Sequence, residues 1–578
     1  MTTNTFYHVW RNNQLKDLIR VKINDGGVIH IDLAHLNSYS AYLSSIKESS
    51  RNWNSNIFIK LEIKNKEQFI QYLAHPFRNL INFLYFTDVV DVSFLPLEIA
   101  PQVEREEEEE GEENINREER VRYKIRFDCS LIPESVEKLS VFVQDDTICS
   151  GKLPESITAL DIYQSSIIQL NSSFVKHVLR DLPSRLKSLS LPNDFVFTTV
   201  YPKYSFPETL VDFHYTSTDD NLENFDSAKV LNKCQLRVHK LEALRWVQDN
   251  PWIVDLDLFI VPVSEKDPPI PLHITHLTTN VTIVNFDLLP PGLEFLRCIG
   301  NMTILTTRQL PFLKRLSLDS YKYQLNKNVV PRTLEDLEII MYNEPLEEGI
   351  LPSGLKTLCL ENFDQDLQVG ILPFSLTKLQ LYKFKKLLKP SVLPNGLKEL
   401  FLYEFNNCET NLLQHTLPPS LTSLSLNSYT GSFENIGPLN NLSRLSIHSL
   451  QPSLSKLLSN VVNIKLSFYN LESTNCSKSK KSKKSKKSSK SSKSKSVPAT
   501  FLANTTIQNL VLSYTPTTIQ SFGTKFNLYP EFLPFRLVKL ETIGVEIHSA
   551  ELIPSSCIFL KTDINGLNRD FVSNSVKY

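Results

Sequence analysis

Residues 310–450 repeat one short motif seven times, as LPFLKRLSL, VPRTLEDLEI, LPSGLKTLCL, LPFSLTKLQL, LPNGLKELFL, LPPSLTSLSL and PLNNLSRLSI. We call the apolar residue that follows the L-P turn the leading residue of a repeat. In this block the leading residues are Leu313, Leu334, Leu355, Leu376, Leu397, Leu421 and Leu442, at spacings of 21, 21, 21, 21, 24 and 21 residues. A fixed period of this length predicts a repeat protein in which each repeat forms one turn of a solenoid.

The end of each motif predicts a short strand. In LPSGLKTLCL, Leu358 and Leu360 alternate with other residues, and a period of two places both leucines on one face. The upstream L-P suits a turn into the strand, because proline fixes φ and cannot donate to a β-ladder. We therefore expect a leucine-rich-repeat-like solenoid, α/β or mainly β, with a parallel β-sheet on its concave face.

Two further apolar positions recur in each repeat. Eight residues after the leading residue stands an aromatic residue: Tyr321, Tyr342, Phe363, Phe384, Phe405 and Tyr429. Twelve residues after it stands Leu325, Leu346, Leu367, Leu388 or Phe433, while the 24-residue repeat has Glu409 there and leaves Leu412 or Leu413 to fill the gap. We expect the aromatic residues to form a ladder inside the solenoid rather than a ligand cage.

Weaker copies of the motif extend over residues 130–471 and 497–578, the last of which also supplies a C-terminal cap. Their leading residues are Val136, Ile157, Leu186, Leu210, Ile253, Ile274, Leu293, Val461, Ile507, Leu537 and Cys557. The 43 positions between Leu210 and Ile253 are enough for two turns. Within them, residues 236–249 (LRVHKLEALRWVQD) have a helical pattern.

Residues 1–100 do not follow the motif. They predict a cap over the first repeat, or a docking region for another protein. Apolar spacing favours a helix within residues 6–19, a strand at 57–63 and a helix-like run at 69–84.

Two charged segments interrupt the repeats. Residues 101–129 predict an acidic disordered linker, because ten glutamates and four arginines fall within 104–122. Residues 472–496 form a Lys/Ser-rich run that cannot build a core, and subtracting its 25 residues from the 46 between Val461 and Ile507 restores a period of 21. This run is either a solvated insert or, through Lys478–Lys495, a basic patch for an anionic partner.

The composition limits the class of protein. The chain has 578 residues and a formal net charge of −1, so charge balance favours neither nucleic acid nor membrane as a partner. No secretory signal and no membrane-spanning stretch is expected. Eight scattered cysteines without a C-x-x-C motif predict reduced thiols and a cytoplasmic protein, with the nucleus as the alternative compartment.

No motif predicts catalysis. The sequence lacks a P-loop, H-E-x-x-H, G-x-S-x-G and G-x-G-x-x-G, and it has only 15 glycines. The nearest histidine pair, His273 and His276, brackets two repeat residues and is not expected to bind a metal. We therefore predict no enzyme, no cofactor, no metal site and no small-molecule substrate.

The candidate site follows from repeat geometry. Residues two, four and six positions after the leading residue should face the open concave side of the sheet. Tyr382, Phe401 and Tyr403 then form an exposed aromatic cluster, with Glu361 and Gln380 beside it. Such a cluster is typical of a protein-binding site, although another segment or chain could cover it.

The stretch 342–352, YNEPLEEGILP, resembles the FNIP repeat, a relative of the leucine-rich repeat with an F-N-x-P-type core. A second, weaker copy begins at Phe363, and FYHVWRNNQL at residues 6–15 resembles the leader of FNIP-repeat proteins. The resemblance covers roughly residues 130–565 and implies a repeat scaffold without an assigned catalytic activity.

Three functions remain open from the sequence. The first is a non-enzymatic scaffold that binds proteins through the concave face. The second is a substrate-recognition subunit of a ubiquitin ligase, docked through residues 1–100. The third is a binder of nucleic acid or an anionic surface through Lys478–Lys495.

Overall fold

The computed structural model describes most of the repeat-bearing chain. The described residues are 27–52, 57–94, 98–99, 123–144, 147–164, 173–193, 195–197, 203–227, 229–240, 242–258, 268–280, 289–300, 310–326, 330–406, 412–470, 502–515 and 526–562. They fall into two compact units. Unit 1 is Met1–Val261 with Lys266–Ile274, and unit 2 is Pro262–Glu265 with Thr275–Tyr578.

Unit 1 alternates strands with short helices. Its elements are β1 (Val28–Ile31), α3 (Leu33–Asn52), β2 (Phe58–Ile63), α4 (Lys66–Ala74), η1 (Arg78–Leu80), β3 (Phe83–Phe86), β4 (Glu98–Ile99), β5 (Tyr123–Lys124), β6 (Arg126–Asp128), η2 (Cys129–Leu131), β7 (Lys138–Val143), β8 (Ile148–Ser150), β9 (Ala159–Gln164), α5 (Ser173–Leu179), β10 (Ser188–Ser190), β11 (Tyr204–Ser205), β12 (Asp212–Ser217), α6 (Asp219–Leu222), β13 (Phe225–Asp226), β14 (Asn232–Val238), α7 (Ala243–Gln248) and β15 (Asp255–Leu258).

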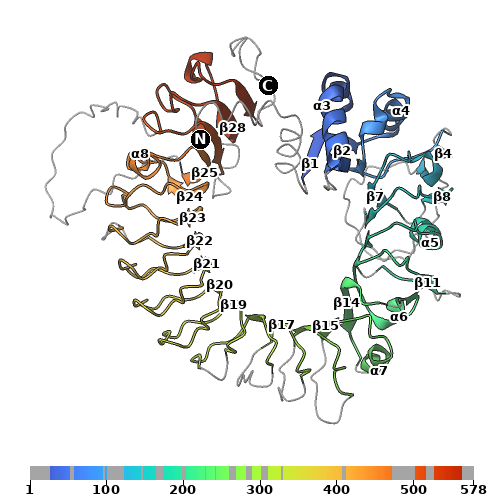
Figure 1. Ribbon diagram of the computed structural model, residues 1–578, viewed down its shortest axis with the longest axis horizontal. Coiled ribbons are helices and arrows are strands. Elements are labelled where there is room, and N and C mark those ends of the chain that lie inside the picture. The colour runs from blue at the N-terminus through green and yellow to red at the C-terminus, as the bar shows by residue number, and fades with distance from the viewer. Residues whose placement is uncertain are drawn as a thin grey trace, which may run out of the picture. The chain divides into compact units, whose positions relative to one another are not determined.

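The main strands of unit 1 form one parallel sheet in the order β1-β2-β3-β7-β9-β10-β12-β14-β15. The helices α5, α6 and α7 lie on the side of the turns away from these strands (Figure 1). Short pairs, β6 with β8 and β11 with β13, are also parallel. Each turn therefore contributes a strand to the sheet and a helix or second short strand to the other side.

Unit 2 consists almost entirely of strands and turns. Its elements are β16 (His276–Thr279), β17 (Phe295–Cys298), β18 (Arg315–Leu318), β19 (Asp336–Ile339), β20 (Thr357–Leu360), β21 (Lys378–Gln380), β22 (Glu399–Phe401), β23 (Ser423–Leu426), β24 (Arg444–Ser449), α8 (Leu454–Leu457), β25 (Asn463–Asn470), β26 (Asn509–Tyr514), β27 (Phe526–Asn527), β28 (Lys539–Ile543), β29 (Val545–Glu546), η5 (Ala550–Leu552) and β30 (Phe559–Thr562). The main strands pair in parallel from β16 to β26, then β28 and β30.

Repeat positions stack in register from one turn to the next. Leu337 pairs with Leu358, and Leu358 pairs with Leu379, all on the buried side of the sheet. The leading residues of all the repeats named above are buried as well. The predicted leucine-rich-repeat-like parallel solenoid is confirmed.

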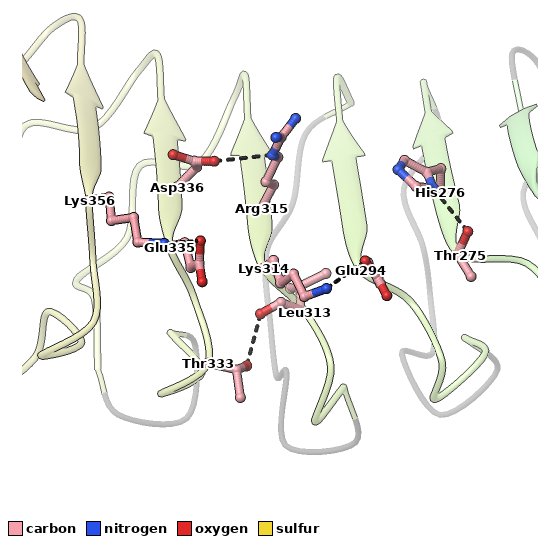
Figure 2. A network of polar contacts seen from close by, with 10 residues as sticks. All are labelled: Thr275, His276, Glu294, Leu313, Lys314, Arg315, Thr333, Glu335, Asp336 and Lys356. Atoms are coloured by element: carbon pink, nitrogen blue, oxygen red, sulfur yellow. Dashed lines mark hydrogen bonds and ion pairs between the residues drawn. The ribbon is translucent and has the colours of Figure 1, made fainter. Parts of the chain in front are cut away.

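One backbone contact recurs at most steps of the described solenoid. The amides of Lys356 and Thr357 both donate to the carbonyl of Glu335 in the preceding turn, at 2.7 and 3.0 Å. The same positions carry ion pairs such as Glu335–Lys356 and Glu294–Lys314, at 2.7 and 2.8 Å (Figure 2). These side chains are largely exposed, so the ion pairs contribute little beside the backbone bonds.

The aromatic ladder is present inside unit 2. Neighbouring rings lie nearly parallel, with centroids 6.3 Å apart for Tyr342–Phe363, 6.4 Å for Phe363–Phe384 and 6.2 Å for Phe384–Phe405. All four side chains are buried. In the 24-residue repeat, Leu412 is buried and Leu413 is exposed, so Leu412 fills the open position.

A ladder of hydroxyl groups also links the turns, and the sequence analysis missed it. The residue just before the leading residue is often Ser or Thr, and its hydroxyl donates to the carbonyl of the preceding leading residue. These bonds join Thr333 to Leu313, Ser375 to Leu355, Ser420 to Leu397, Ser156 to Val136, Thr209 to Leu186, Thr506 to Val461 and Ser556 to Leu537, at 2.6–3.0 Å. Each bond satisfies a backbone acceptor at the turn, where no strand can pair with it.

Two expectations for residues 1–129 need correction. Residues 28–86 contain β1, β2 and β3 and continue the sheet of unit 1, with β3 paired to β7, and their role as a cap or a docking region stays a prediction. The expected helix-like run 69–84 ends at Ala74, because Pro76 disfavours a helical conformation at His75, and β3 follows. Residues 123–129 form β5, β6 and the start of η2 rather than linker.

The stretch between Leu210 and Ile253, where the motif is hard to recognise, forms the two predicted turns of the solenoid. Leu231 is the missing buried leading residue between Leu210 and Ile253. The stretch 236–249 is helical only in α7, because Leu236 and Val238 complete strand β14 and face the core. A short apolar run cannot be assigned to helix or strand by spacing alone.

Several predictions concern residues outside the described ranges. These are the helix within 6–19, the linker at 101–122 and the Lys/Ser run 472–496 with Lys478–Lys495. Among the helices that the structure describes, none is both long and apolar enough to cross a bilayer.

The carboxyl group of Asp255 in unit 1 lies in surroundings that disfavour its charged form. Asp255 and Asp257 extend from β15 on the same face of the sheet, and the amide of Gln235 donates to Asp255 Oδ1 at 3.1 Å. Burial, and to a smaller extent the nearby Asp257 carboxylate, raises the pKa of Asp255 from 3.8 to about 6, against the opposing effect of the Gln235 bond. The ionised form of Asp255 therefore destabilises the fold near neutral pH.

We predict that Ser375→Ala lowers the free energy of unfolding by about 1 kcal/mol, because the carbonyl of Leu355 loses its hydroxyl donor. Denaturant unfolding followed by circular dichroism measures the change. Ser353→Ala is the matched control, since Ser353 precedes the same kind of leading residue by two positions and is exposed. Equal stability of both variants would contradict a role for the hydroxyl ladder.

We predict that Asp255→Asn stabilises unit 1 by up to about 3 kcal/mol near pH 7 and by little near pH 4. The folded pKa of Asp255 is raised, so its stabilising contribution is full below its unfolded pKa of 3.8 and is lost as pH rises through about 6. Asparagine keeps the acceptor for Gln235 without the charge. Thermal unfolding at both pH values tests this, and a pH-independent gain would contradict it.

Candidate functional site

The open face of the sheet in unit 2 carries the residues two, four and six positions after each leading residue. Strands such as β19 alternate half-buried and buried residues, with the half-buried ones on this face. Parallel pairing aligns equal positions, so side chains from successive turns form rows across the face. The residues predicted from repeat geometry lie in these rows.

Three of them form what we call the aromatic patch: Tyr382, Phe401 and Tyr403. The side chain of Tyr403 is 49% exposed, and its ring centroid lies 6.3 Å from that of Tyr382 at a tilt of 37°. Phe401 is half-buried, and the Nζ atom of Lys378 lies 5.8 Å from its ring centroid. An exposed tyrosine, Tyr403, and a half-buried one, Tyr382, thus sit beside a half-buried phenylalanine.

Gln380 and Glu361 border the aromatic patch on its N-terminal side, and both are half-buried. The amide of Gln380 donates to the hydroxyl of Tyr382 at 3.4 Å, which orients that ring. Burial raises the pKa of Tyr382, and the nearby Cys359, Glu361 and Glu338 raise it further. Tyr382 therefore remains a neutral hydrogen-bonding group at physiological pH.

Glu361 belongs to what we call the acidic group: Glu338, Cys359 and Glu361. One ligand atom from each lies within 4.8 Å of the others. The hydroxyl of Ser317 donates to Glu338 at 3.0 Å. Burial and the two carboxylates raise the pKa of the Cys359 thiol to about 12, so the thiol is neutral.

A thiol and two carboxylates are a donor set that a borderline-soft cation such as Zn²⁺ accepts. This group was not recognised from the sequence because Glu338 lies one turn, 21 residues, before Cys359, whereas Cys359 and Glu361 are two residues apart in the next turn. His273 and His276, the pair that was considered, lie outside it, and the ring of His276 contacts the hydroxyl of Thr275 at 2.9 Å (Figure 2).

A hollow of about 280 Å³ opens on the C-terminal side of the aromatic patch. Its lining includes Phe401, Ser425, Arg444, Ser446, Lys465 and Tyr469, and we call it the serine hollow. Its depth comes from a step in side-chain size, because Ser425 and Ser446 occupy the row position that Phe401 fills one turn earlier.

Hydrogen bonds hold the wall of the serine hollow. Ser425 and Ser446 both donate to Asn427 Oδ1, at 3.0 and 2.9 Å. The hydroxyls of Ser446 and Tyr469 share a bond of 2.9 Å. Arg444 is paired with Glu399 at 3.1 Å, which leaves Lys465 as the cation without an ion-pair partner in the described lining. Since the hydroxyl groups bond to one another and to Asn427, Lys465 is the group in the described lining that can bind an acceptor side chain.

Apart from Phe401, the residues of the serine hollow were not predicted as site residues from the sequence, and neither were Glu338 and Cys359. The rows themselves were readable, since Ser425 and Ser446 stand four positions after Leu421 and Leu442. The signal was the change from one large side chain to two small ones along a row. Recognising the hollow also required knowing that Lys465 and Tyr469 lie beside these serines, and their repeat departs from the central motif.

The profile of the FNIP repeat matches the chain at residues 342–384, 363–405 and 384–429, which include the aromatic patch. Solved structures similar to the chain include the functional domain of InlJ from Listeria monocytogenes, with 17% identity, a TM-score of 0.30, and coverage of 58% of this chain and 70% of that one. No curated protein sequence shows significant similarity to the present chain.

The repeats within residues 342–429 therefore match the FNIP repeat in sequence and also form successive turns of the parallel solenoid. The in-register aromatic ladder of Tyr342, Phe363, Phe384, Phe405 and Tyr429 lies within the matched range. Residues 342–429 of the chain therefore carry FNIP repeats.

Proposed function

We propose that the chain is a non-enzymatic scaffold that binds a protein partner through the open face of unit 2, between β19 and β25. The observation that carries the proposal is the exposed Tyr403 ring beside Tyr382 on the open sheet face. A repeat solenoid presents such a face as an extended binding surface.

The physical basis is the energetics of aromatic anchors. Tyrosine and phenylalanine bury large area at low cost in side-chain entropy, and they dominate binding energy at protein interfaces. The Gln380 bond holds Tyr382 in place before any partner arrives. The serine hollow beside Phe401 can receive one partner side chain. Anchor and hollow together provide the centre of an interface.

Charge at the two ends of this surface supports one orientation of the partner. Glu338 and Glu361 lie on the N-terminal side of the aromatic patch, and Arg444 and Lys465 lie on its C-terminal side. A segment with a basic residue at one end, an apolar residue in the middle and an acidic residue at the other end complements this arrangement. Rim charges of this kind set orientation and association rate more than affinity.

The double variant Phe401→Ala, Tyr403→Ala should lose its partners, with affinity lowered more than about tenfold, because truncating one interface hot spot already costs about 2 kcal/mol. Cross-linking in cells followed by mass spectrometry identifies the partners of the wild-type chain. Binding of each purified partner to wild type and variant then measures the loss.

Phe312→Ala, Phe374→Ala is the matched control. These side chains are 61% and 90% exposed, and both lie in turns rather than on the open face. The control should keep the partners of the wild type. Unchanged partners in the double variant, at unchanged thermal stability, would contradict the proposal.

The segment Lys478–Lys495 favours a second candidate function, binding of nucleic acid or an anionic surface. Deleting residues 472–496 should then abolish a binding that weakens steeply with salt. Binding that is unaffected by the deletion would exclude this function. A ubiquitin-ligase role would instead show as ligase subunits that are lost on deleting residues 1–30, with the aromatic patch intact.

A further inference from the structure

Two thiols meet in unit 1, whereas the surface proposed above belongs to unit 2. The Sγ atoms of Cys129 and Cys149 lie 3.5 Å apart, in adjacent turns. Cys129 is fully buried, and Cys149 is partly exposed on strand β8. The cysteines Cys234, Cys298, Cys359 and Cys557 are also free thiols, each in a different turn of the described chain.

The backbone on both sides of the pair is tightly held. Strand β8 pairs with β6, which places Cys149 opposite Phe127. Asp128 caps the turn that contains Cys129, by accepting from the amide and the hydroxyl of Ser130 at 3.0 and 2.6 Å. Neither cysteine depends on a long loop for its position.

Gly151 locks the two segments together. Its φ of +68° is in the left-handed region, and a Cβ added there would lie 2.6 Å from the carboxylate of Asp128 and 2.9 Å from the amide of Ser130. A ring nitrogen of His177 contacts the Gly151 carbonyl at 2.7 Å. Close approach of backbone to backbone therefore keeps the thiols side by side.

A small reagent can reach the pair through Cys149, which is partly exposed, whereas Cys129 is buried. A hollow of about 250 Å³ is lined by Cys129 together with Gly151, Lys152 and His177. Cys149 is reached from the side of β8, whose flanking residues Ile148 and Ser150 are exposed. A peroxide is small enough to enter such a space, whereas a folded oxidoreductase is not.

We propose that Cys129 and Cys149 are an oxidation site, at which a hydroperoxide converts the two thiols into a disulfide that ties adjacent turns of unit 1. A disulfide has an S–S length of about 2.0 Å, so the sulfurs must approach by about 1.5 Å. Side-chain rotation supplies a movement of that size. The pairing needs no encounter between distant segments.

The reaction balances in two steps. The sulfur of Cys149, as the thiolate, attacks the peroxide, the O–O bond breaks, and Cys149 becomes a sulfenic acid while water or an alcohol leaves. The sulfur of Cys129 then attacks Cys149, the S–O bond breaks, and the hydroxyl leaves as water with the proton of Cys129. Two thiols lose two hydrogen atoms and one peroxide is reduced.

The roles of the two cysteines follow from their surroundings. The hydrogen bond from Cys149 and burial both raise the pKa of Cys129, so this thiol keeps its proton. The partly exposed Cys149 is then the group that meets the oxidant first. The buried Cys129 resolves the sulfenic acid before a second peroxide can oxidise it further.

The test is treatment of the folded, reduced full chain with hydrogen peroxide, followed by blocking of free thiols and non-reducing peptide mapping by mass spectrometry. We expect the peptides of Cys129 and Cys149 to appear linked, with the mass of two hydrogens lost, at least about tenfold faster than thiols are lost at Cys234 and Cys298. Dithiothreitol should reverse the link.

Cys149→Ser should abolish the linked peptide, and the matched Cys234→Ser, which removes a buried single thiol, should leave it in place. The wild-type map is decisive even where a variant folds poorly. A Cys149 that proceeds to sulfinic acid unlinked, a Cys129 linked to any other cysteine, or a pair that stays reduced while the single thiols react would overturn the proposal.

Discussion

The structure depends on one backbone contact repeated at most turns of the described chain, in which two successive amides donate to a single carbonyl of the turn before. Lys356 and Thr357 on Glu335, and Thr377 and Lys378 on Lys356, are successive instances. The contact holds each strand in parallel register with the last, so that every repeat position lies over its equivalent. Leucine then packs on leucine and ring on ring, and the apolar edge of one turn is covered by the next.

This register constrains the residue type at some positions of a repeat and leaves it variable at others. Positions that point inward must match the turn above and the turn below, as the stacked rings of Phe363 and Phe384 do. Positions four and six on the open face meet only neighbours in a row and the solvent. Function can vary there without disturbing the core, and there the aromatic patch, the acidic group and the serine hollow are found. The Cys129–Cys149 pair uses the same register on the other side of unit 1, where a one-turn separation places two thiols in contact.

The limits of prediction are visible at individual residues. The aromatic ladder and the open-face positions of Tyr382 and Tyr403 could be predicted because a period of 21 and a period of two are both readable along the chain. The helix-like run 69–84 was wrong after Ala74, because apolar spacing alone does not separate a helix from a turn and strand, and Pro76 decided the matter. The hydroxyl ladder was not predicted, although Thr333, Ser375 and Ser420 each directly precede a leading leucine. The sequence does not show that the carbonyl of the preceding turn lies within hydrogen-bond distance of these hydroxyls.

The sequence by itself determined the parallel solenoid, the inward ladder and the row to which each open-face residue belongs, because these follow from periodicity along one chain. Only the tertiary structure decided which of two leucines, Leu412 or Leu413, entered the core, where a hollow opened beside Phe401, and that Glu338, Cys359 and Glu361 share a site. Those outcomes depend on distances between side chains of different turns. Such distances are set by packing and by rotamer choice, and periodicity does not encode them.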